Sequence, residues 1–125
     1  MRMGHLILVM FGGALGAGAR YAVGTFVGSK SGGFPWATFG VNVTGAFLLG
    51  LLMGALASND AAEPWRLLLG VGVLGGFTTF SALAYETLTL ASDGAMSLGI
   101  LNMAGTGVAG LLAAALGLVV GRALA

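Results

Sequence analysis

The chain has 125 residues, of which 58% are hydrophobic and 7% are charged, and its formal net charge is +1 at pH 7. A water-soluble domain of this length needs far more polar surface, so the composition excludes one and indicates a membrane protein surrounded by lipid. Cysteine is absent and no basic run occurs, which excludes thiolate chemistry and gives no support to nucleic-acid binding.

Four apolar segments are long enough to cross a bilayer, because a spanning helix needs about 20 mostly apolar residues. Short polar breaks separate them, and Trp36 and Trp65 stand near span edges, where indole rings favour the membrane interface. The sequence therefore predicts one all-α transmembrane domain, residues 1–125, with antiparallel neighbouring helices. The predicted spans are residues 6–28, 34–57, 67–91 and 95–121.

Glycines recur at the four-residue spacing that lets two membrane helices approach closely. We expect most of them to serve helix packing. The pairs are Gly12/Gly16, Gly24/Gly28, Gly50/Gly54, Gly72/Gly76 and Gly117/Gly121.

The charges give little preference for one orientation in the membrane. Four spans place Arg2, Arg66 and Arg122 on one side, and Arg20 and Lys30 on the other. Orientation follows Lys/Arg asymmetry, so three against two permits insertion either way and an antiparallel dimer. A single orientation is the alternative. Four helices enclose little polar lining, so we expect any pathway to need a second copy.

Polar side chains recur at helical spacing in two spans. Thr38 and Asn42 share one face of the second span, and Asn102 and Thr106 repeat the same step in the fourth. Polar residues within spans are costly and indicate functional sites by default, so the two stripes predict the lining of a narrow route. The alternative is interhelical hydrogen bonding that only holds the bundle together.

The third span contains a predicted helix break in the stretch GGFTTFS, residues 75–81. Two glycines followed by hydroxyl residues make a poor helix, and the freed backbone groups need protein or a cavity to satisfy them. Carbonyls ending the first half-helix can hold a cation, and N–H groups opening the second favour an anion. Phe80, Leu83 and Glu86 follow on one face, and a phenyl edge there can contact a small anion.

The sequence shows no sign of an enzyme. Gly70-x-Gly72-x-x-Gly75 matches the dinucleotide fingerprint as a string, but it lies inside an apolar span with no preceding strand. We therefore expect a transport or structural role.

Three stretches resemble the Fluc/CrcB family of fluoride channels. They are GGALGAGARY at 12–21, TFGVNVTGAFLLG at 38–50 and GVLGGFTTFSALAYE at 72–86. The resemblance implies a dual-topology homodimer of four-helix subunits, with two antiparallel pores in a bacterial inner membrane. It further implies passive export of fluoride, which relieves fluoride toxicity.

The resemblance also implies roles for individual residues. A structural sodium ion at the dimer centre would be held by the backbone carbonyls of Gly75 and Thr78. Arg20 matches the family arginine at the end of the first helix, beside the vestibule. The implied fluoride pore is lined by Thr38, Asn42, Thr79, Phe80, Ser81, Leu83, Glu86, Asn102 and Thr106.

Leu83 departs from the family pattern, which reads TTFSTF where this chain reads TTFSAL. Leucine has no aromatic edge, so we expect slower or less selective conduction, or a hetero-oligomer in which another subunit supplies the ring. Two other functions remain open. One is a dual-topology, proton-coupled exporter of cationic compounds that uses Glu86, and the other is a non-conducting accessory subunit.

Overall fold

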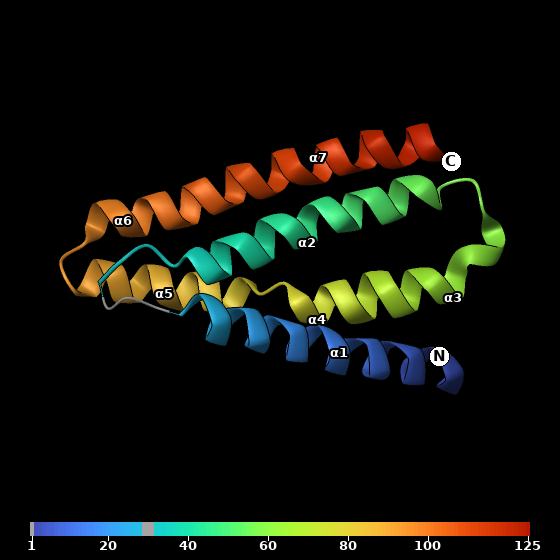
Figure 1. Cartoon of the computed structure of the whole chain (residues 1–125), viewed down its shortest axis with the longest axis horizontal. Helices are drawn as coiled ribbons and strands as arrows, with labels where there is room; N and C mark the ends of the chain where they lie inside the picture. Colours follow the sequence, from blue (N-terminus) through green and yellow to red (C-terminus); the bar gives the residue numbers. More distant parts are fainter. Residues whose placement is uncertain (1, 29–31) are drawn as a thin grey trace.

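The computed structural model describes residues 2–28 and 32–125, and Lys30, predicted on the far side of the membrane, lies outside them. Within these residues, four helical segments are long and apolar enough to cross a membrane. They lie side by side as an elongated bundle (Figure 1). The first two are α1 (Met3–Val27) and α2 (Trp36–Ala55). The third segment comprises η1 (Asp60–Ala62), α3 (Glu63–Trp65), η2 (Arg66–Leu74), α4 (Gly75–Phe77) and α5 (Phe80–Ser92). The fourth segment comprises α6 (Met96–Ile100), η3 (Leu101–Gly105) and α7 (Thr106–Leu124).

The termini and connecting segments lie at the two ends of the bundle as the four predicted spans require. Both chain termini and the connection from α2 to α3 lie at one end, and the turn between α5 and α6 lies at the other (Figure 1). At that turn Gly94 adopts a φ of 85°, and the N–H of Ala95 donates to the Leu90 carbonyl at 2.8 Å. Glycine tolerates this left-handed conformation, which closes the end of a helix.

The third span begins earlier than predicted, because residues 60–65 are helical and not a loop. The Asn59 side chain accepts a hydrogen bond from the Ala61 N–H at 3.0 Å and so caps the first turn. Pro64 fits the opening turn of a helix, where its missing N–H costs nothing. The Arg66 guanidinium donates to the carbonyls of Leu56 and Asn59, which ties this start to the end of α2.

Close packing at glycines joins the helices in two pairs. Gly12 and Gly16 of α1 face η2 and α4 around Gly72 and Gly76. In the second pair, Gly50 and Gly54 of α2 face Gly117 and Gly121 of α7. These four glycine pairs confirm the predicted packing. The fifth pair, Gly24 and Gly28, does not take part, because an added Cβ there would meet nothing within 4 Å in the described chain.

The third span is broken at Thr78 and Thr79, which confirms the predicted break. Thr78 has φ −75° and ψ 156°, and Thr79 has φ −151° and ψ 113°, so both are extended between α4 and α5. Gly75 and Gly76 nevertheless remain helical. An added Cβ at Gly76 would lie 2.6 Å from the Gly13 carbonyl oxygen, so that glycine allows close packing against α1. The threonines, not the glycines, make the break.

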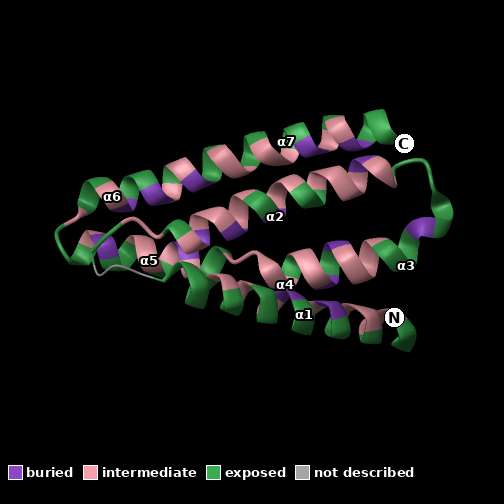
Figure 2. Cartoon of the chain, in the orientation of Figure 1, coloured by how far each residue is buried: buried purple, intermediate pink, exposed green. Residues whose placement is uncertain are grey.

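The protomer buries few side chains. Figure 2 shows short buried stretches where helices meet and exposed residues along the outer faces. Apolar residues on those faces suit a lipid environment. The buried set includes Thr38, Asn102 and Thr106, so polar groups lie within the bundle and not only at its ends.

We expect Gly16→Ala to lower the thermal unfolding midpoint of the detergent-solubilised protein. The new methyl group would overlap the Val73 carbonyl oxygen, and overpacking of this kind costs about 1–3 kcal/mol. Gly18→Ala on the same helix is the matched control, because a Cβ there meets nothing within 4 Å. Equal midpoints for the two variants would contradict the close packing of α1 on the third span.

Candidate functional site

Two polar residues of α2 bind the second half of the third span. The Thr38 hydroxyl donates to Oε1 of Glu86 at 2.7 Å. One turn further along α2, Asn42 Nδ2 donates to the Thr79 carbonyl at 3.0 Å, and Asn42 Oδ1 accepts from the Thr79 N–H at 2.7 Å. The predicted polar face of the second span is therefore directed at the break and at α5.

The hydroxyl groups of the break are bonded locally. The Thr78 hydroxyl donates to the Leu74 carbonyl at 2.9 Å, within the first half of the span. The Thr79 hydroxyl accepts from the Ala82 N–H at 3.1 Å and lies 3.2 Å from the Ser81 hydroxyl oxygen. Thr79 is thus the N-cap of α5, because it satisfies one of the free N–H groups that open a helix.

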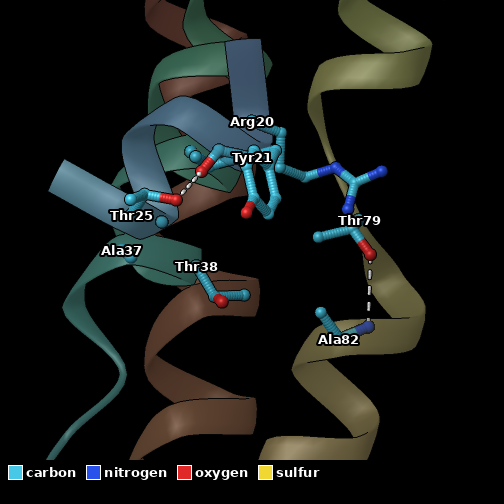
Figure 3. A pocket seen from close by; sticks show the side chains of 9 residues that line it. Arg20, Tyr21, Thr25, Ala37, Thr38, Thr79 and Ala82 are labelled. Atoms are coloured by element: carbon cyan, nitrogen blue, oxygen red, sulfur yellow. Dashed lines mark hydrogen bonds between the residues drawn. The ribbon is translucent and has the colours of Figure 1, made fainter. Parts of the chain in front are cut away.

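Arg20 of α1 reaches the end of the first half-helix. Its Nε donates to the Gly76 carbonyl at 3.2 Å. Carbonyls at a helix end carry partial negative charge, so a guanidinium there is favourable. Figure 3 shows the Arg20 side chain extending toward Thr79, with Thr38 on a neighbouring helix. These residues border a cavity of about 310 Å³, whose lining is Arg20, Tyr21, Gly24, Thr25, Ala37, Thr38, Val41, Thr79 and Ala82.

A second cavity of about 360 Å³ lies beside the same break. Asn42, Gly75, Thr78, Thr79 and Phe80 line it, together with Leu83, Thr106 and apolar residues of α2 and α7. Thr79 lines both cavities, so the extended break between α4 and α5 contributes to each of them.

Phe80 and Leu83 stand in different surroundings although both line the second cavity. The Phe80 side chain is 74% exposed in the protomer, whereas Leu83 is 6% exposed. The ring at 80 is therefore open to a partner or to lipid, and the side chain at 83 packs within the bundle.

Asn102 and Thr106 share a buried face of the fourth span, as predicted. Asn102 is 0% exposed and its Nδ2 donates to the Thr87 hydroxyl at 3.1 Å. That bond joins η3 to α5, which is the interhelical role weighed as the alternative to a pore lining. Three buried oxygens make no hydrogen bond within residues 2–28 and 32–125: Glu86 Oε2, Asn102 Oδ1 and Thr106 Oγ1.

The structure brings most of the predicted site residues to the two cavities, but not all. Ser81, Glu86 and Asn102 line neither of them. Tyr21 and Thr25 line the first cavity and were not predicted. Their four-residue spacing beside Arg20, within an apolar span, was the available signal.

The arrangement supplies hydrogen-bond donors, backbone carbonyls and an aromatic edge, but little fixed charge. In the described part of the chain, no group of three or more His, Cys, Asp or Glu side chains is placed to hold a metal ion.

The fold and the site define a small multi-pass membrane protein with a discontinuous helix, an architecture used to move ions across membranes. Residues 7–118 match the family described as "CrcB-like protein, Camphor Resistance (CrcB)", and the chain belongs to this family.

The chain is similar over most of its length to proteins described as fluoride-specific ion channels. The chain is 46% identical over 125 residues to the fluoride-specific ion channel FluC of Thermus thermophilus, covering 99% of this chain and 98% of the relative. It is also 46% identical over 120 residues to the FluC of Novosphingobium aromaticivorans, covering 94% and 95% respectively. Over 88 residues it is 53% identical to the FluC of Caulobacter vibrioides, covering 68% and 69%.

Proposed function

We propose that the protein is a passive, fluoride-selective ion channel that exports fluoride from a bacterial cell across its inner membrane and relieves fluoride toxicity. The full-length similarity to fluoride-specific channels supports the assignment. The observation that carries it is the position of Thr79, which lines both a cavity beside Arg20 and a cavity beside Phe80. A helix broken at this point gives an ion a route along hydroxyl groups and freed backbone groups.

The chemistry of the route suits a small, strongly hydrated anion. Hydrogen-bond donors and the positive edge of a phenyl ring replace water without binding so tightly that the ion cannot leave. The proposed lining is the predicted set, Thr38, Asn42, Thr79, Phe80, Ser81, Leu83, Glu86, Asn102 and Thr106. Movement follows the electrochemical gradient.

The working channel in this proposal is an antiparallel homodimer. The exposed Phe80 ring and the apolar rim of the second cavity support a partner on this face. The rim is formed by Leu49, Leu74 and Leu111. The near balance of Lys and Arg between the two sides permits protomers of opposite orientation.

A structural sodium ion at the dimer centre fits the carbonyls at the end of α4. The Gly76 carbonyl accepts from Arg20 and the Leu74 carbonyl accepts from Thr78. In the described chain, the hydrogen bonds around the break leave the carbonyls of Gly75 and Thr78 without a donor. Hard alkali and alkaline-earth cations prefer such oxygen ligands. When bound, sodium would supply positive charge between converging carbonyls and link the two protomers.

Vesicles that contain only this protein should release trapped fluoride and retain chloride. The assay uses purified dimers in sodium-containing buffer, with empty vesicles as the control and a fluoride electrode as the detector. Release no faster than from empty vesicles would show that the homomer is not a fluoride channel. Proton-driven uptake of a lipophilic cation by the same vesicles would instead favour the exporter.

Replacing sodium by a large organic cation during purification and assay should lower both fluoride release and the dimer fraction. The physical reason is that the proposed ligands, the carbonyls of Gly75 and Thr78, would then have no small cation to hold. Size-exclusion chromatography with light scattering measures the dimer. Release and dimer fraction that are the same in both media would contradict a structural role for sodium.

Leu83→Phe should increase fluoride release or its preference over chloride by about two- to tenfold, since an aromatic contact contributes about 0.5–1.5 kcal/mol. Leu83→Met keeps a similar apolar volume without a ring and is the matched control. If the two variants behave alike, an aromatic edge at this position has no effect. If wild type is inactive and only Leu83→Phe conducts, the hetero-oligomer is favoured.

A further inference from the structure

Both backbone polar groups of Thr79 are bonded to one side chain, the amide of Asn42. Asn42 Oδ1 accepts from the Thr79 N–H at 2.7 Å, and Asn42 Nδ2 donates to the Thr79 carbonyl at 3.0 Å. The pair of bonds resembles the way a neighbouring strand holds an extended residue. Thr79, with φ −151° and ψ 113°, is extended.

The conformation of Thr79 decides where α5 begins. Thr79 is the N-cap of α5, and Phe80 is its first residue. A change in the Thr79 dihedral angles would turn the start of α5 and move the Phe80 ring relative to the second cavity. The direction of this half-helix therefore depends on what holds Thr79.

The helix that holds Thr79 is itself firmly packed. Asn42 lies on α2, which packs along α7 at Gly50, Gly54, Gly117 and Gly121. An added Cβ at Gly54 would lie 2.5 Å from the Leu118 carbonyl oxygen, so the two backbones are in direct contact. Asn42 thus connects the break to a fixed pair of helices.

The bonds to Thr79 also limit what Asn42 can offer an ion. A carboxamide has one carbonyl oxygen and two N–H donors. The oxygen and one donor are bonded to Thr79, which leaves one N–H. A large share of the side chain's hydrogen bonding is therefore directed at the protein itself.

We propose that Asn42 is a positioning residue: it holds Thr79 extended and so fixes the start of α5 and the Phe80 ring beside the second cavity. This inference rests on the proposed fluoride channel for its effect on permeation, whereas its structural part concerns the protomer alone. The competing role is direct donation to fluoride with no part in holding the break.

Amide hydrogen exchange separates the two roles, because the Thr79 N–H is itself one of the groups that Asn42 binds. The full chain is placed in lipid nanodiscs without fluoride, and exchange is followed by mass spectrometry. Asn42→Leu keeps the branching at Cγ but removes both hydrogen bonds, and Asn42→Ala is a second variant without added volume. Thr44→Ala is the matched control on the same helix, since Thr44 is exposed. Amides of α7 report that each variant is folded.

Both Asn42 variants should exchange the Thr79 and Phe80 amides at least about tenfold faster than wild type, because a bonded N–H has become free to open. They should also lose fluoride release in vesicles, while Thr44→Ala keeps wild-type exchange and release. Exchange at the wild-type rate would overturn the positioning role, and so would faster exchange with undiminished release. The proposed channel function fails separately, if wild-type vesicles release no fluoride.

Discussion

Lipid offers no hydrogen bonds, so a helix broken within a span must have its freed backbone groups satisfied by the protein or face a cavity. This constraint accounts for the polar residues around Thr78 and Thr79. The Gly76 carbonyl is bonded by Arg20, and the Thr79 N–H and carbonyl are bonded by Asn42. Thr79 Oγ1 then caps α5. Arg20 and Asn42 are each isolated polar residues in an apolar stretch of sequence. In the structure both form hydrogen bonds with backbone groups around the break, to which three different spans contribute.

The two halves of the broken span are held by different physical means. The first half, η2 and α4, lies against α1 by backbone contact at glycines, where dispersion forces act over a short distance. The second half, α5, is joined to α2 and η3 by side-chain hydrogen bonds from Thr38, Asn42 and Asn102. Each half also has a contact of the other kind: Arg20 donates a side-chain hydrogen bond to Gly76 of the first half, and Gly99 of α6 lies close to the Thr87 carbonyl of the second. The break lies where the main partner changes from α1 to the fourth span.

Much of the fold was predictable because it depends on local chemistry. Span length and polar breaks predicted the four spans, and small residues at four-residue spacing predicted most of the helix contacts; the structure confirms both. What the sequence could not reveal depends on the partner of each group. Gly75 and Gly76 are poor helix formers by sequence, but both are helical, and the missing side chain at Gly76 allows close contact with α1. Gly24 and Gly28 have the same spacing as the packed glycines and no helix to pack against. The burial of Leu83 and the two hydrogen bonds between Asn42 and Thr79 likewise form only when the spans are assembled.

Arg20 presents a test of the proposed function on electrostatic grounds, because a permanent cation beside an anion route can either attract the ion or trap it. Its Nε is bonded to the Gly76 carbonyl at the negative end of a half-helix, which offsets part of its charge. The cavity beside it has a volume of about 310 Å³, which is room for several water molecules, so an ion there can keep part of its hydration and the attraction is screened. Within the proposed channel, Arg20 therefore raises the local concentration of anions at the entrance, while the uncharged donors beyond Thr79 allow them to leave. A full positive charge is compatible with permeation when it lies beside a hydrated cavity and is partly offset by a bonded carbonyl.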